Sequence, residues 1–247
     1  MNPWDKIVTL PSIDSTNSYA AQLLLQSKNI KEGTIAYTYD QKAGRGLGQN
    51  TWESEKGKNL TFSIILLPYF LPIQHHYMLS KVISLGLFEY ASSKLTDIKI
   101  KWPNDIYYKD KKLAGILIEN SIKGSTINYS VAGIGLNLNQ EQFFSNAPNP
   151  VSLKQITGKN YSIEEELVSV RQHIKKYYQK LQSGQMEEIN RLYIESLYRF
   201  NKFHKFRWNN QDFSAKITGV NEYGHLQVLT SDRETKEFEF KEIEFLI

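Results

Sequence analysis

Apolar side chains change their spacing from one stretch of this chain to the next, and the order of these spacings constrains the fold most. Residues 76–95 repeat apolar residues at helical spacing. β-branched and aromatic residues are concentrated in shorter stretches on both sides, which is typical of strands. The expected strands are residues 7–11, 34–39, 60–67, 98–102, 113–118 and 127–131. This order predicts an α+β fold with a mixed β-sheet flanked by helices.

Three further helices are expected. The polar run 14–17 supplies N-cap candidates for a helix directly after the first strand. Two helical patterns follow the sheet, at residues 162–181 and 186–198, with Ser183 and Gly184 as the turn between them.

The last fifty residues have a different character. Short strands are predicted at residues 213–220, 225–229 and 237–240, separated by turn-forming polar residues. This pattern is typical of a small all-β barrel. We therefore predict two domains, a larger one over residues 1–200 and a barrel over residues 201–247.

Composition excludes several kinds of chemistry. The 247 residues include no cysteine, which rules out disulfides, thiolate metal sites and cysteine nucleophiles. The five histidines are scattered without a metal-ligand spacing, and the net charge of +4 is that of a mixed surface rather than a nucleic-acid-binding one. The first residues lack the features of a signal peptide, and no apolar stretch is long enough to span a bilayer. We expect a soluble, cytoplasmic protein.

A glycine-rich loop is predicted between two strands, at residues 41–59. It contains the segment 44–48, which reads GRGLG. Alternating glycines let the backbone approach a ligand closely and point N–H groups at an anion. A glycine-rich surface loop without a function would explain the same letters, so the segment is weak evidence when taken alone.

Three more segments carry polar residues at or near strand ends. Residues 101–105 read KWPND, residues 111–119 read KKLAGILIE, and residues 133–139 read GIGLNLN. A lysine, an amide and a carboxylate at a strand end suit a site for phosphate and a metal ion. The alternatives are an Asn-Asp turn, a hairpin with a charged turn, and a bulged strand.

The order and spacing of these four segments, with Ser15, Thr16 and Asn17 upstream, resemble the biotin protein ligase family. The resemblance is specific over residues 7–139 and continues more weakly to the end of the chain. It implies a catalytic domain like that of class II synthetases and an SH3-like C-terminal barrel. Because the first strand is expected at residue 7, it also implies a form without an N-terminal helix-turn-helix, and hence no binding of nucleic acid.

The resemblance implies a role for each matching residue. Lys112 and Arg45 would be catalytic, Asp105 would hold Mg²⁺, and Trp52 would pack over the ligand. The residues implied to bind biotin are Ser15, Thr16, Asn17, Gln41, Gly44, Arg45, Trp52, Gly115, Gly133 and Gly135. Those implied to bind ATP are Lys101, Asn104, Lys112 and Asn137.

One departure from the family pattern concerns charge. The family loop commonly reads GRGxxGxxW, whereas Gln49 stands at the third glycine of that pattern and the loop holds a single arginine. More of the stabilising charge is then expected from Arg45, Lys101 and Lys112. The departure bears on how well a reactive adenylate is retained.

The implied reaction uses ATP to convert biotin into biotinyl-adenylate and then transfers biotin to a lysine of a biotin carboxyl carrier protein. Strand pairing at residues 115–121 is expected to dock the carrier or to join two copies as a homodimer. Two alternatives stay open. One is a lipoate or octanoate ligase of related fold, and the other is a biotin sensor without catalysis.

Overall fold

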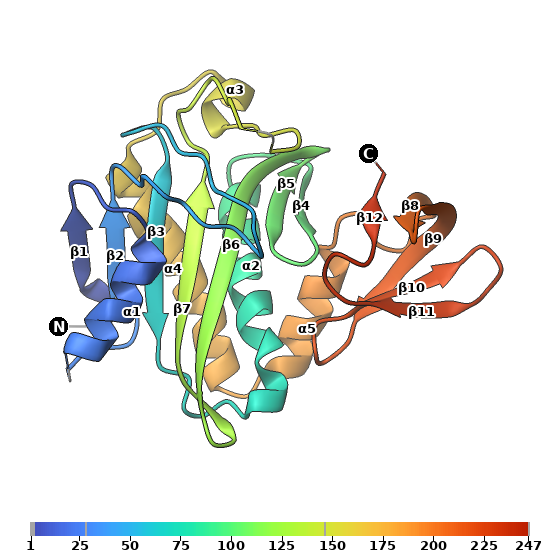
Figure 1. Cartoon of the computed structure of the whole chain (residues 1–247), viewed down its shortest axis with the longest axis horizontal. Coiled ribbons are helices and arrows are strands. Elements are labelled where there is room, and N and C mark those ends of the chain that lie inside the picture. Colours follow the sequence, from blue (N-terminus) through green and yellow to red (C-terminus); the bar gives the residue numbers. More distant parts are fainter. Residues whose placement is uncertain (1–2, 28, 146, 247) are drawn as a thin grey trace.

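Figure 1 shows a computed structural model that describes residues 3–27, 29–145 and 147–246. Its larger part is a seven-stranded sheet in the order β1-β2-β3-β7-β6-β5-β4. β1 and β2 are parallel and the other neighbours are antiparallel, so the sheet is mixed, as predicted. The strands are β1 (Ile7–Leu10), β2 (Ile35–Thr38), β3 (Leu60–Leu66), β4 (Ile98–Lys101), β5 (Asp105–Tyr108), β6 (Lys111–Lys123) and β7 (Thr126–Leu136).

Helices cover both faces of this sheet (Figure 1). Ser15 caps α1 (Thr16–Gln26), which packs through Ala20 on Ala36, Ile65 and Val131. The opposite face carries the larger core, under α2 (Tyr77–Ser92), α4 (Ile163–Gln182) and α5 (Met186–Glu195). All seven residues of β3 are buried, because both of its faces are covered. The predicted α+β class is confirmed.

The C-terminal part forms a second, antiparallel sheet in the order β11-β10-β9-β8-β12. Phe206, Ile217, Val228 and Phe238 are buried inside it. A small five-stranded sheet of this kind fits an SH3-like barrel. The strands are β8 (His204–Trp208), β9 (Gln211–Val220), β10 (Leu226–Thr230), β11 (Thr235–Phe238) and β12 (Glu244–Phe245). The domain boundary near residue 200 stays a prediction.

Several short elements were not expected from the sequence. They are β5, β8, β12, α3 (Leu153–Thr157), η1 (Pro3–Asp5) and η2 (Ile73–His75). Residues 133–136 continue β7 as regular strand, paired with β3 and β6, instead of forming a bulge. α5 ends at Glu195, three residues before the predicted end. Within the described residues, no helix is long and apolar enough to cross a membrane.

Candidate functional site

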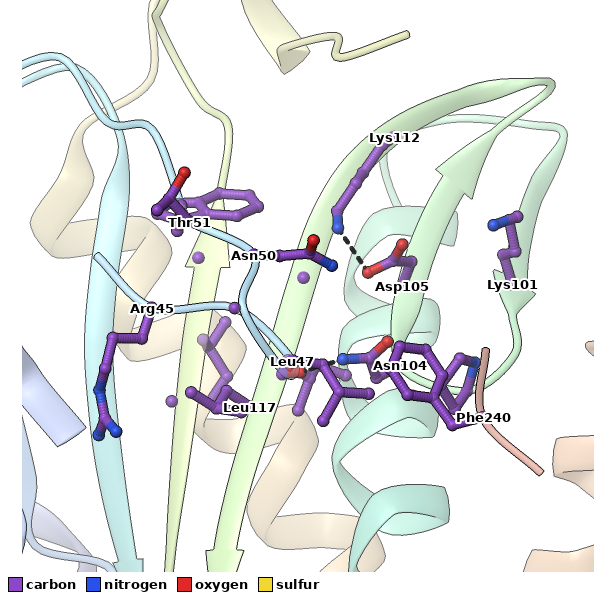
Figure 2. Close-up of a pocket in the computed structure, with 18 of the residues that line it drawn as sticks. Arg45, Leu47, Asn50, Thr51, Lys101, Asn104, Asp105, Lys112, Leu117 and Phe240 are labelled. Atoms are coloured by element: carbon purple, nitrogen blue, oxygen red, sulfur yellow. Dashed lines mark hydrogen bonds and ion pairs between the residues drawn. The ribbon is translucent and has the colours of Figure 1, made fainter. Parts of the chain in front are cut away.

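A pocket of about 530 Å³ lies between the glycine-rich loop, the strands β4 to β7 and the end of the barrel. Figure 2 shows part of its lining, with Lys112, Asp105 and Asn104 on one side and Arg45 on the other. Residues that lie far apart in the sequence line it, so the site exists only in the folded chain. They include Ser15, Thr16, Asn17, Gln41, Arg45, Trp52, Lys101, Asn104, Asp105, Lys112, Gly115, Gly133, Gly135, Asn149, Phe240, Lys241 and Phe245.

A hydrogen-bonded group of neutral side chains forms one end of the pocket, at the start of α1. Thr16 donates its backbone N–H to Gln41 Oε1 over 2.9 Å. Ser63 Oγ lies 2.8 Å from Thr16 Oγ1 and 2.6 Å from Asn17 Oδ1. Gly133 leaves room for Asn17, because a side chain on Gly133 would collide with that amide. The group can meet the hydrogen-bonding atoms of an uncharged ligand.

The glycine-rich loop folds back on itself over the sheet. Gly46 N–H donates to Asn50 O over 2.7 Å, and Trp52 N–H donates to Gly44 O over 2.9 Å. A side chain on Gly44 would collide with the carbonyl of Trp52, so this turn requires glycine.

The Trp52 side chain packs against β6 and β7, at Gly115 and Gly135. A side chain at Gly135 would overlap its indole ring, and one at Gly115 would lie 3.1 Å from Trp52 Cζ3. These two glycines therefore make room for the tryptophan. The buried Trp52 Nε1 has no hydrogen-bond partner within the described chain.

The side chain of Arg45 is directed away from Lys112 (Figure 2). Its Nη2 lies 2.8 Å from Glu119 Oε2 on β6, and the Arg45 side chain is 46% exposed. The same carboxylate oxygen accepts a 2.8 Å hydrogen bond from Asn17 Nδ2. Glu119 thus connects the loop to the neutral end of the pocket, a role that was not predicted from the sequence.

Lys112 and Asp105 form an ion pair of 2.7 Å between Nζ and Oδ1 at the other end. The pairing of β5 with β6 shifts register between Ile106 and Tyr107, directly beside Lys112. The Lys112 backbone is also held from the far side, by hydrogen bonds to Asn149 O and from Val151 N–H. Because both main-chain sides are fixed, the lysine side chain starts from a defined position.

Asn104 and Lys101 lie on the same side of the pocket as Lys112, and both side chains are held by contacts with the protein. Asn104 binds Ile116 twice, through Nδ2 to the carbonyl at 2.5 Å and through its own carbonyl to the N–H at 3.0 Å. The ammonium of Lys101 lies 5.2 Å from the ring centre of Tyr107 and 4.9 Å from that of Phe245. Burial lowers the pKa of Lys101, and the nearby Asp105 opposes that shift.

Asp105 supplies the carboxylate that could hold a metal ion at the charged end of the pocket. The described residues contain no group of three or more side chains that could form a metal site of their own. Asp105 Oδ1 is paired with Lys112, which leaves Oδ2 for a cation. Mg²⁺ beside nucleotide phosphates typically uses only one or two carboxylates. The donor set therefore fits an ion that arrives with a triphosphate.

All but two of the predicted site residues line this pocket. Gly44 and Asn137 are outside the lining, and Asn137 Nδ2 donates to Val151 O over 3.2 Å. The pocket also contains residues that sequence reasoning did not single out. They include Asn50, Thr51, Thr61, Tyr107, Pro148, Asn149, Phe240, Lys241, Ile243, Glu244 and Phe245. Only the folded barrel brings the last five to the site.

Comparisons with known proteins agree on one family. Residues 9–137 match the biotin/lipoate A/B protein ligase family. The bifunctional ligase/repressor BirA of Bacillus subtilis is 30% identical over 232 residues, which cover 89% of this chain and 68% of that protein. The biotin–[acetyl-CoA-carboxylase] ligase of Paracoccus denitrificans is 31% identical over 165 residues, 64% of this chain and 67% of that protein.

Among solved structures, a biotin protein ligase from Aquifex aeolicus in complex with biotin and ATP superposes with a TM-score of 0.79 at 25% identity. The match covers 98% of this chain and 99% of that one. It therefore includes the C-terminal barrel as well as the large sheet.

Proposed function

Because the chain belongs to the biotin/lipoate A/B protein ligase family, we propose that it is an ATP-dependent biotin protein ligase. The observation that carries the proposal is that one pocket joins a neutral end, at Thr16 and Gln41, to a charged end, at Lys112 and Asp105. The neutral end suits the urea of biotin, and the charged end suits a carboxylate reacting at a phosphate. The Aquifex ligase with bound biotin and ATP supports the assignment.

Biotin binds at the start of α1 in this proposal. Within the described residues Gln41 Oε1 is occupied by Thr16, and no hydrogen bond holds the Gln41 amino group, which can donate to the urea oxygen. Ser15 and Asn17 lie beside it in the lining. Trp52, which rests on Gly115 and Gly135, covers the apolar part of the ligand.

Activation takes place at the charged end. The biotin carboxylate attacks the α-phosphorus of ATP, a new P–O bond forms, and the bond to pyrophosphate breaks. Negative charge grows on the phosphate oxygens during this step. The ammonium of Lys112 is fixed in advance beside it, and such preorganised charge is a large source of catalysis. Lys101 and Asn104 lie along the same wall and bind the nucleotide.

Mg²⁺ that arrives with ATP would be held by Asp105, and it would neutralise part of the phosphate charge. Arg45 is the arginine of the glycine-rich loop, which covers the adenylate and excludes water. Gly44 permits the turn of that loop, and Asn137 supports the wall behind Lys112 through its bond to Val151.

Transfer needs a carrier. The amine of a lysine on a biotin carboxyl carrier protein attacks the carbonyl carbon of the adenylate, the bond from that carbon to the phosphate oxygen breaks, and AMP and a proton leave. We propose that the reaction takes place in the cytoplasm, without nucleic acid, and that the protein forms a homodimer when no carrier is bound.

The decisive experiment separates the two half-reactions. Purified protein is incubated with labelled biotin and MgATP, and pyrophosphate is measured. A carrier domain is then added, and label on the carrier is measured. We expect pyrophosphate release that depends on biotin, followed by labelling of the carrier. Release with lipoate or octanoate but not with biotin would overturn the substrate assignment, and no release with any acid would indicate a binding protein.

A further inference from the structure

The C-terminal barrel forms one wall of the pocket, although it lies outside the stretch that matches the family. The residues at positions 240, 241 and 243–245 all belong to this wall. Trp102, at the end of β4, attaches it: Trp102 Nε1 donates to Gly224 O over 2.9 Å, and its ring lies edge-on to Phe240. Both Trp102 and Gly224 are buried. The wall is therefore held in a fixed position relative to Lys101 and Asn104.

The cations that line the pocket differ in how far their charge is already neutralised. Arg45 is paired with Glu119 at 2.8 Å and Lys112 with Asp105 at 2.7 Å. Lys101 is enclosed between the rings of Tyr107 and Phe245. Lys241 is the remaining cation of the lining, and among the described residues it has no carboxylate within ion-pair distance.

The carboxylates next to Lys241 in the sequence are engaged elsewhere. Glu242 accepts the N–H of Glu239 over 2.6 Å, and Glu244 lies 3.8 Å from Arg207. Within the barrel, the Lys241 ammonium lies 5.8 Å from the centre of the Phe240 ring. A cation in a pocket without a carboxylate partner is ready to bind an anion.

Lys241 also touches the glycine-rich loop. A side-chain carbon on Gly48 would lie 2.7 Å from Lys241 Nζ, and Gly48 has a left-handed backbone with φ of +69°. The ammonium therefore occupies the space that a side chain at Gly48 would fill. Lys241 of the barrel and the backbone of the loop therefore lie in contact beside the pocket.

We propose that Lys241 binds the phosphate chain of ATP and supplies positive charge that the single-arginine loop lacks. This inference rests on the proposed ligase function. A triphosphate in the pocket would draw the ammonium away from Phe240 and place it between the loop backbone and the phosphates. The barrel then takes part in nucleotide binding, in addition to any role in holding the carrier.

The test replaces Lys241 and measures both substrates. In Lys241→Gln we expect the KM for ATP to rise about tenfold, because a charge-assisted hydrogen bond is lost, while the KM for biotin stays unchanged. Lys241→Arg should restore most of the ATP affinity. Lys205→Gln removes the same charge from an exposed position on β8 outside the lining, and it should behave like the parent protein.

An unchanged KM for ATP in Lys241→Gln would overturn the inference, and so would an equal rise for both substrates or a failure of arginine to restore affinity. Calorimetric titration with ATP measures nucleotide binding without catalysis, so it distinguishes failure of the Lys241 inference from failure of the ligase assignment. If the parent protein released no pyrophosphate, the proposed function would fail. Weaker ATP binding by Lys241→Gln would still support the inference, and equal binding would refute it.

Discussion

Lys112 is the side chain on which the proposed chemistry depends most. It lies in the pocket with its ammonium 2.7 Å from Asp105 and its backbone tied to Asn149 and Val151. We expect Lys112→Ala to fold normally and to lose a factor of about 10² to 10³ in biotin-dependent pyrophosphate release, the usual effect of removing one preorganised charge. Lys111→Ala provides the control, because Lys111 is an exposed neighbour outside the lining. Similar rates in the two variants would contradict the role of Lys112.

Arg45 connects the glycine-rich loop to β6 through Glu119, so its removal should loosen the loop. We expect Arg45→Gly to release biotinyl-adenylate into solution, which is measured as biotin attached to bystander proteins. Glu119→Gln removes the charge that holds the guanidinium and should produce part of the same leak. The idea is wrong if Arg45→Gly leaks no more adenylate than the parent protein, or if only Glu119→Gln leaks.

The role of a residue could be predicted from the sequence where it depends only on the residue itself and its neighbours along the chain. Ser15 as a helix cap and the glycines 44 to 48 as a close-approach loop follow from the letters alone. The spatial neighbours of Gly135 and Arg45 could not be predicted in this way. Gly135 accommodates Trp52, and Arg45 binds Glu119 74 residues away, and neither contact leaves a signal in the sequence spacing.

At the scale of elements, β6 has a free edge. It runs from Lys111 to Lys123, but β5 pairs only with its first part, up to Gly115. The main-chain N–H and C=O of Ile116 are both hydrogen-bonded to Asn104, at the edge where β5 ends. In an antiparallel strand the main-chain groups of every second residue point to the same edge. The N–H and C=O of Ile118 therefore point to this edge, beyond the part that β5 pairs with. The expectation of strand pairing at residues 115–121 stays a prediction, and the unpaired edge supports it.

We expect Ile118→Pro to lose transfer of biotin to the carrier while pyrophosphate release is preserved, because proline removes one outward N–H. Ile118→Ala keeps that N–H and should transfer nearly normally. The two half-reactions are assayed separately. Undiminished transfer by the proline variant would refute edge docking, and equal loss of both half-reactions would mean that the sheet itself was damaged.

The sequence predicted long elements better than short ones. β3 and α2 were found because seven or more residues repeat one pattern. β5 was missed because its first residue is the aspartate of an Asn-Asp pair, which reads as a turn. β12 has only two residues, and it exists because it pairs with β8 and not because of its own propensity.

The stability of the whole molecule should depend on the protonation of one lysine. Lys81 is 3% exposed on α2, donates to Asn190 Oδ1 over 2.6 Å, and has no carboxylate partner within the described chain. Burial lowers the pKa of Lys81 from 10.5 to about 8. Between these two pH values the unfolded chain binds a proton that the folded protein does not. Stability therefore rises with pH in this window, by up to about 3 kcal/mol.

Lys81→Met removes the titrating group and should abolish that contribution. We expect the free energy of unfolding of the parent protein, relative to the variant, to increase between pH 7.5 and pH 10, as measured by denaturant unfolding. Lys99→Met, at an exposed position on β4, should retain the parent profile. If the free energy of unfolding depended on pH in the same way in the parent protein and in Lys81→Met, Lys81 would not titrate in this range.

Whole-molecule organisation was predictable in outline only. The change of pattern near residue 200 indicated a separate barrel, and a second sheet is present from β8 onward. That the barrel completes the pocket was not predictable, because Phe240 and Lys241 are more than 130 residues from Lys101 and Asn104 in the sequence. Contacts of this kind depend on how the two sheets pack together.

The packing of Trp52 against Gly115 and Gly135 gives the protein a built-in optical signal. The chain has four tryptophans, and two of them, Trp52 and Trp102, line the pocket, while Trp4 and Trp208 do not. The indole emission of Trp52 depends on what surrounds its ring, whose buried Nε1 has no hydrogen-bond partner among residues 3–27, 29–145 and 147–246. A ligand in the pocket packs against this ring and changes that environment directly. Occupancy of the pocket can thus be followed from the native fluorescence, without a label.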